Sequence, residues 1–242
     1  MRSKGGTLAV LVGAVCGSGP AMADNPLHHN GVSRIYDPYV QAMEKELELR
    51  TLYQWDDNPV ENRVIQQRIG YGFSVNDRVF AEAYAIGTRF PDKPLNIEAY
   101  ELEAKIQLTE QGEYSTDWGV LVEYEREISE SIAELALTLL GSRQWGNWVG
   151  TVNVGLEYEF GSDITDEIDR FLNAQWRYRY KEALEPGVEF YADEFTRGIG
   201  PVLAGTVRGQ GKRKWIWEAG LIAPLNDTTP DTTFRFLLEY EF

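Results

Sequence analysis

The sequence predicts an all-β protein, a transmembrane antiparallel up-and-down β-barrel of about 12 strands with both termini on the same side of the membrane. Three observations lead to this prediction. Runs of about 9–11 residues alternate apolar and polar side chains, as strands tilted across a bilayer do. Aromatic residues gather near the ends of these runs. The chain also ends on such a run, with Phe242 as its last residue.

The first residues have the features of a secretory signal peptide. Arg2 and Lys4 form a charged n-region, residues 7–16 are largely apolar, and Ala21-Met22-Ala23 is a small-x-small cleavage site. The apolar stretch is far shorter than the ~18 residues that a spanning helix needs. Cleavage after Ala23 therefore makes residues 1–23 the signal peptide of an exported protein.

Two alternatives fit this N-terminus less well. The three residues before Cys16 depart from a lipoprotein signal, and a short buried helix leaves the flanking charges unexplained. Because Cys16 is the only cysteine, the mature chain has none, and burial and hydrogen bonding alone hold it together. Its length of about 220 residues suits one barrel or sandwich domain.

The charge balance argues against nucleic acid as a partner. The whole chain has a net charge of −15, and removal of Arg2 and Lys4, with no acid lost, makes the mature chain −17. Phosphate binding needs clustered Lys and Arg. A membrane remains compatible with this charge if the acidic side chains point away from lipid.

Residues 24–44 are expected to be an N-terminal arm, with a possible short helix or a plug for the barrel. Residues 24–37 are polar and contain Pro and Gly, which favours a flexible segment. Asp37 and Pro38 could cap a short helix over residues 39–46. The alternative begins a strand at about Lys45, and both remain open.

The remaining chain, residues 45–242, is a series of alternating runs separated by turn residues. The expected strands are 45–55, 63–73, 78–87, 96–108, 117–125, 132–140, 149–160, 171–180, 187–195, 201–209, 214–223 and 233–242. In the fourth run, Tyr100 and Leu102 lie on one face and Glu101 and Glu103 on the other. The run at 201–209 has the weakest alternation.

Alternation alone leaves open which face meets water, since sandwiches and lipocalin-like barrels turn their apolar side inward. The length of the runs, the aromatic residues at their ends and the continuity of the charged face favour a barrel with a polar lumen. Inside hydrocarbon, every unpaired backbone group is costly, so strands must close into a barrel. The last strand is then expected to pair with the first.

The final run carries the most specific pattern. One face holds Phe234, Phe236, Leu238, Tyr240 and Phe242. This run resembles the C-terminal strand of Gram-negative outer-membrane β-barrel proteins, which the barrel-assembly machinery reads as a signal. The resemblance implies an outer-membrane location, periplasmic termini, and membrane lipid and the assembly machinery as partners.

Two further stretches, DPYVQAMEKELELR at 37–50 and GYGFSVNDRVFAEAY at 70–84, resemble small exported barrels associated with phenol-degradation meta-pathway operons. Those barrels are presumed transporters, so this resemblance implies movement of a small solute. The predicted outer loops are short, which favours a compact pore or plugged barrel over a receptor.

Catalysis is not expected, and neither is a cofactor or a bound metal. The only histidines are His28 and His29, both in the arm. Serine hydrolysis and most general-base schemes at neutral pH need a positioned histidine. An adjacent pair in an arm is more often solvated than part of a metal site, which needs three or four convergent ligands.

The polar face is expected to line the lumen, with an excess of acid. The candidates for lumen or selectivity residues are Glu101, Glu103, Lys105, Glu123, Glu157, Glu159, Arg177, Arg179, Arg235 and Glu239. Arg177 and Arg179 are two residues apart and point the same way, as a local basic ladder.

These charges allow two functional hypotheses. The first is a channel or transporter for small polar solutes, in which carboxylates favour cations. The alternative is a structural or interaction barrel, plugged or sealed by its own ion pairs, without conductance. A soluble periplasmic ligand binder with an apolar interior is a third possibility. The transported solute is not encoded in any motif of the sequence.

Overall fold

The computed structural model describes residues 31–59, 62–162 and 164–242. The predicted signal peptide, the first part of the arm, and His28 and His29 lie outside the described residues. The described chain forms twelve strands and contains no helix that could span a membrane. The strands are β1 (Lys45–Trp55), β2 (Ile65–Ser74), β3 (Val79–Arg89), β4 (Asn96–Gln107), β5 (Asp117–Glu127), β6 (Ile132–Trp145), β7 (Trp148–Gly161), β8 (Glu167–Tyr178), β9 (Glu185–Ala192), β10 (Arg197–Arg208), β11 (Lys214–Pro224) and β12 (Thr232–Glu241).

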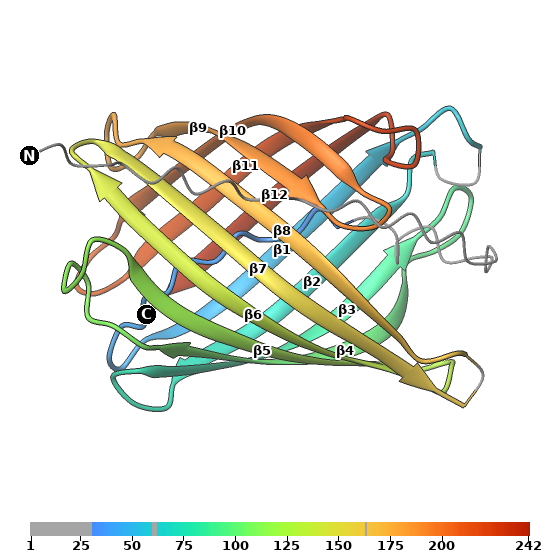
Figure 1. Ribbon diagram of the computed structural model, residues 1–242, viewed down its shortest axis with the longest axis horizontal. Helices are drawn as coiled ribbons and strands as arrows, with labels where there is room; N and C mark the ends of the chain where they lie inside the picture. Colours follow the sequence, from blue (N-terminus) through green and yellow to red (C-terminus); the bar gives the residue numbers. More distant parts are fainter. Residues whose placement is uncertain (1–30, 60–61, 163) are drawn as a thin grey trace, which may run out of the picture.

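These strands form one closed antiparallel barrel (Figure 1). Each strand pairs with its neighbours in sequence, and β12 closes the ring by pairing with β1. The predicted fold of a closed up-and-down barrel is confirmed. The closing ladder runs without interruption from Glu46 opposite Glu241 to Trp55 opposite Thr232.

Two strands begin four residues earlier than the sequence predicts. β8 begins at Glu167 and β10 at Arg197, in stretches that the pattern assigned to turns. In β10 the reason is glycine. A Cβ at Gly200 would lie 1.9 Å from the carbonyl oxygen of Leu221, so glycine lets the neighbouring strand approach closely rather than forming a turn.

The short helix considered over residues 39–46 is absent. Residues 42 and 43 form a turn instead, with Met43 at a φ of 63°, and β1 begins at Lys45. A left-handed residue at this point reverses the direction of the chain and is incompatible with a continuing right-handed helix.

The barrel has two ends, which we call the near end and the far end. The near end holds the start of β1, the end of β12 and the connections at 75–78, 108–116, 146–147, 179–184 and 209–213. The far end holds the connections at 56–64, 90–95, 128–131, 162–166, 193–196 and 225–231. All connections are short, from 2 to 9 residues.

Apolar side chains cover the outside of the barrel, and polar ones point inward. In β12, Phe234, Phe236 and Leu238 are partly exposed on the outer face, whereas Arg235 and Glu239 are buried inside. This arrangement is the reverse of a soluble barrel and matches a lipid-facing surface. The predicted direction of the two faces therefore agrees with the structure.

Aromatic side chains form clusters near both ends of the outer surface. At the near end, Trp145 stacks on Trp176 with ring centroids 5.2 Å apart, and Trp215 packs against Tyr240 at 4.4 Å. At the far end, the rings of Tyr158 and Phe160 stack at 5.3 Å. Such girdles mark the two boundaries between lipid and water.

We expect the cost of a charge on the outer face to depend on depth. Leu203 lies midway along β10 and is 45% exposed, whereas Val207 lies near the near-end girdle, opposite Trp215. Leu203→Arg should lower the free energy of unfolding in a bilayer by about 2–4 kcal/mol, and Val207→Arg by only about 0–1 kcal/mol. Denaturant titration in lipid vesicles measures both. Equal losses at the two positions would contradict the proposed membrane boundaries.

Candidate functional site: the lumen and the segment inside it

Residues 31–44, the lumen segment, run through the barrel from the far end to the near end. At the far end, the amide of Gly31 donates a hydrogen bond of 2.8 Å to Oγ1 of Thr196 in the connection between β9 and β10. At the near end, the hydroxyl of Ser74 donates to the carbonyl of Gln41. The segment therefore passes along the whole interior of the barrel.

Two residues of the lumen segment, two positions apart, bind opposite walls. The Arg34 guanidinium donates to Glu48 on β1 and, at 2.8 Å, to Glu239 on β12. Two residues later, the amide of Tyr36 donates to Oδ1 of Asn153 on β7 at 2.7 Å, and Asn153 Nδ2 donates back to the Tyr36 carbonyl at 2.8 Å. β7 lies halfway around the ring from β1. The segment thus bridges the lumen at this level.

Apolar contacts hold the same stretch. Val32 and Ile35 pack against Tyr191 and Ile222, with Leu52 beside them. Tyr36 packs against Leu121 and Leu140 in a second cluster. Full burial of an aliphatic or aromatic side chain stabilises the folded state by about 1.5–3 kcal/mol. These few residues therefore contribute much of the free energy that holds the segment in the lumen.

The half of the segment closer to the near end rests on β4 and β5. The hydroxyl of Tyr39 donates to Asp117 at 2.8 Å, and the amide of Val40 donates to Oε1 of Gln107 at 2.8 Å. Burial and the hydrogen bond to Asp117 raise the pKa of Tyr39 to about 12, so the phenol keeps its proton as donor. A Cβ at Gly119 would lie 2.9 Å from Cβ of Pro38, so glycine leaves room for the segment here.

Buried arginines organise the polar part of the lumen. Arg50 donates to Glu48 and Tyr84, and Arg68 to Glu101. Further around the wall, Arg235 binds Glu189, with 2.6 Å from Nε to Oε2, and Glu218 at 2.5 Å. The guanidinium carbons of Arg34 and Arg50 lie 5.1 and 5.2 Å from the centroid of the Tyr36 ring. These cation–π contacts join the segment to the ion-pair network.

The structure places the predicted lumen residues in different environments. Glu101, Glu103, Arg235 and Glu239 are buried and paired. Nζ of Lys105 lies 5.7 Å from the centroid of the Phe80 ring.

The other candidates are less enclosed. Glu123, Glu157 and Glu159 are half-buried on the inner face. Arg177 and Arg179 lie close together at the near end, where Glu185 approaches both at 3.5 and 3.8 Å. The pair faces a carboxylate but is partly open to solvent.

Sequence reasoning missed the residues that seat the lumen segment, namely Arg34, Tyr36 and Asn153. A signal was available. Leu121, Leu140, Tyr191 and Ile222 are apolar residues at inward positions of otherwise polar strand faces. Apolar side chains inside a polar lumen need an apolar cover, and only another part of the chain or a ligand can supply it.

Comparisons with known proteins find the same architecture at low sequence identity. No family model matches the chain, and no curated protein matches it. The COG4313 outer membrane channel from Pseudomonas putida F1 superposes with a TM-score of 0.55 at 11% identity, over 87% of this chain and 98% of that one.

Two other solved barrels are similar. The KdgM porin has a TM-score of 0.54 at 12% identity and covers 81% of this chain and 99% of its own. The translocator domain of the autotransporter NalP from Neisseria meningitidis has a TM-score of 0.50 at 15% identity, over 85% and 90% of the two chains. The shared property is the fold of an outer-membrane β-barrel.

We expect Asn153→Ala to loosen the lumen segment without opening the barrel wall. The change removes both hydrogen bonds to the Tyr36 backbone and leaves that amide and carbonyl buried without a partner. The cost of about 1–3 kcal/mol corresponds to roughly 5- to 150-fold faster hydrogen exchange at the Tyr36 amide. Strand amides of β7 should keep their protection. An unchanged rate at Tyr36 would show that Asn153 does not hold the segment.

Proposed function

We propose that this chain is an outer-membrane channel for small polar solutes, closed at rest by residues 31–44. The observation that carries the proposal is the bridge across the lumen, in which Arg34 binds the β1–β12 wall while Tyr36 binds β7. A barrel of 12 strands lies between the filled eight-stranded barrel and the open porin of about 16 strands. Its lumen is wide enough to hold an extended segment and to conduct once that segment leaves.

The seating of the segment is compatible with release. Most of its polar contacts end on side chains that water or a polar solute can solvate, among them Glu48, Glu239, Glu103, Asp117 and Asn153. The lumen segment contains no strand, so its release breaks no ladder of the barrel. A conformational step of this kind changes conductance and leaves the wall intact.

The wall that remains after release is acidic. Glu123, Glu134 and Glu159 face the lumen from three neighbouring strands, β5, β6 and β7. Carboxylates that line a narrow passage raise the local concentration of cations. We infer a preference for cations or for solutes with a positive group.

The orientation follows the C-terminal pattern. Phe234, Phe236, Leu238, Tyr240 and Phe242 present the alternating apolar face expected of an assembly signal, which supports a periplasmic near end. Residue 31 then lies at the extracellular end. Membrane lipid and the barrel-assembly machinery are the partners that this orientation requires.

A second candidate is a plugged structural or interaction barrel without conductance. Two apolar clusters and a network of buried ion pairs surround the segment, which favours a permanent plug. The two candidates differ in one property, namely whether the segment ever leaves the lumen of the full-length protein.

Removal of residues 24–44 should convert a mostly closed protein into an open one. In planar bilayers, we expect the mature chain to show brief, infrequent openings, and the shortened chain to show steady current that is several-fold larger on average. The Asn153→Ala variant should open more often than the mature chain. Equal currents from mature and shortened chains would contradict closure by the segment, and silence from mature and Asn153→Ala protein would favour the permanent plug.

Neutral substitutions in the wall should reduce cation preference. In the shortened chain, Glu123→Gln combined with Glu159→Gln removes two inward carboxylates, which have no hydrogen bond or ion pair with a described residue. The reversal potential in a salt gradient should then move toward zero. Glu110→Gln, in an exposed near-end connection, serves as the control and should leave the reversal potential unchanged. Identical reversal potentials for all three proteins would contradict selection by the lumen wall.

A further inference from the structure

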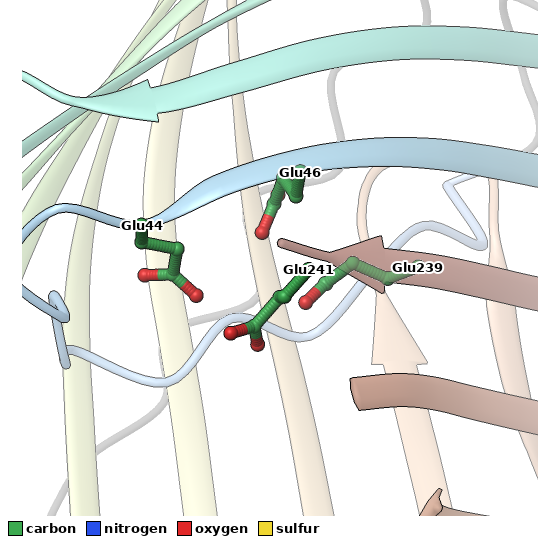
Figure 2. Close-up of side chains that lie close together, drawn as sticks. All are labelled: Glu44, Glu46, Glu239 and Glu241. Atoms are coloured by element: carbon green, nitrogen blue, oxygen red, sulfur yellow. The ribbon is translucent and has the colours of Figure 1, made fainter. Parts of the chain in front are cut away.

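A dense group of carboxylates lies inside the barrel at its near end. Glu44, Glu46, Glu239 and Glu241 each contribute an oxygen, and these four oxygens lie within 4.8 Å of one another. Figure 2 shows the side chains converging from β1, from the residue before it, and from β12. The group therefore spans the seam at which the barrel closes.

The pairing of β1 with β12 forces these charges together. Glu46 is directly opposite Glu241, and Glu48 is directly opposite Glu239. Like charges at directly opposite positions destabilise a sheet. A seam that carries two such pairs needs a compensating positive charge.

A second group shares Glu46 and extends the first. Oxygens of Glu46, Glu48 and Glu82 also lie within 4.8 Å of one another. Between β1 and β3, the residue in register with both Glu46 and Glu82 is Gly72, so no side chain separates the two carboxylates. A Cβ at Gly72 would lie 3.2 Å from Cγ of Glu46.

Two of these carboxylates are buried and have no partner. Glu46 is 4% exposed and Glu82 is 5% exposed, yet neither forms a hydrogen bond or an ion pair with a described residue. Oε1 of Glu82 is fully enclosed and unpaired. Glu46 points toward Glu239 and Glu241 (Figure 2). A buried carboxylate without a partner is costly while it is charged, so it must either take up a proton or be neutralised by a cation.

The neighbouring cations do not balance the charge. The six carboxylates of the two groups face Arg34, Arg50, Lys105 and Lys214. When all six carboxylates are ionised, six negative charges against four positive ones leave two uncompensated, and Arg50 is also shared with Glu103.

We propose that the first group, Glu44, Glu46, Glu239 and Glu241, binds one calcium ion. Hard divalent cations take oxygen ligands, and calcium does so at about 2.3–2.6 Å. Oxygens on opposite sides of a calcium ion are thus about 4.6–5.2 Å apart, which accommodates the spread of the cluster. Magnesium, with about 2.0–2.1 Å to six octahedral ligands, requires a tighter arrangement.

The ion would join three parts of the molecule, namely the two strands of the seam and the end of the lumen segment at Glu44. This inference goes beyond the proposed channel, since the site is formed whether or not the barrel conducts. Its ligands are barrel residues except for Glu44, so the shortened chain should bind calcium more weakly but still measurably.

The test uses the mature chain refolded in detergent without lipopolysaccharide, whose phosphates also bind calcium. After treatment with a chelating resin, isothermal titration with calcium chloride should show one saturable site, and titration with magnesium chloride should show much weaker binding. Glu46→Gln should weaken calcium binding at least tenfold. Glu110→Gln, in an exposed near-end connection outside the cluster, should bind calcium as the unmodified chain does.

Thermal unfolding provides the second readout. Calcium should raise the unfolding temperature of the unmodified chain, whereas Glu46→Gln should unfold at a higher temperature than the unmodified chain without calcium and gain little from it. Glu241→Gln should also gain little from calcium and replaces Glu46→Gln if that variant does not fold. Absence of saturable binding, equal affinity of Glu46→Gln, or binding of magnesium as tight as that of calcium would overturn the proposal.

Discussion

The ladder between β1 and β12 is the interaction on which the rest of the molecule depends. Inside hydrocarbon, backbone groups at an open sheet edge have no partner, so the twelve strands are stable in a membrane only when the ring is closed. Closure fixes the register, and the register decides which face of every strand meets lipid. It also brings Glu46 opposite Glu241 and Glu48 opposite Glu239. The acidic seam is thus a direct consequence of the fold.

The interior of the barrel contains an excess of carboxylates and a few inward apolar side chains. Residues 31–44 supply a positive charge for some of the carboxylates and an apolar cover for the apolar side chains. Arg34 brings a positive charge to Glu48 and Glu239. Val32, Ile35 and Tyr36 cover Tyr191, Ile222, Leu121 and Leu140. Two buried carboxylates that the segment leaves without a partner, Glu46 and Glu82, lie toward the near end, where the proposed cation site is found. Occupation of the lumen and ionic balance are therefore linked through the same residues.

The sequence was sufficient for the fold because the membrane imposes a strict pattern. Alternation along β4, with Tyr100 and Leu102 outside and Glu101 and Glu103 inside, follows from the period of two in a strand. The first residue of a strand was harder to predict than its alternation, as at Arg197, because glycine occurs both in turns and where strands approach closely.

The site was predictable only in part. The inward direction of Glu103 and Arg235 follows from the pattern, but the partner of each depends on distances across the lumen that no local pattern contains. The path of the lumen segment depends on contacts between residues far apart in sequence, such as Tyr36 and Asn153, which are separated by 117 positions. Of this path, the sequence indicated only that an arm was available to act as a plug.

The most direct test of the account is whether the lumen segment lies where the structure places it in the native membrane. Oγ of Ser33 lies 3.3 Å from Nδ2 of Asn173 on β8, and Cys16 of the predicted signal peptide is the only natural cysteine. In barrels extracted from outer membranes, Ser33→Cys combined with Asn173→Cys should therefore form an efficient cross-link on oxidation or with a short thiol-reactive linker. Each single variant should form none. Failure of the double variant to cross-link in folded barrels would contradict a lumen occupied by residues 31–44.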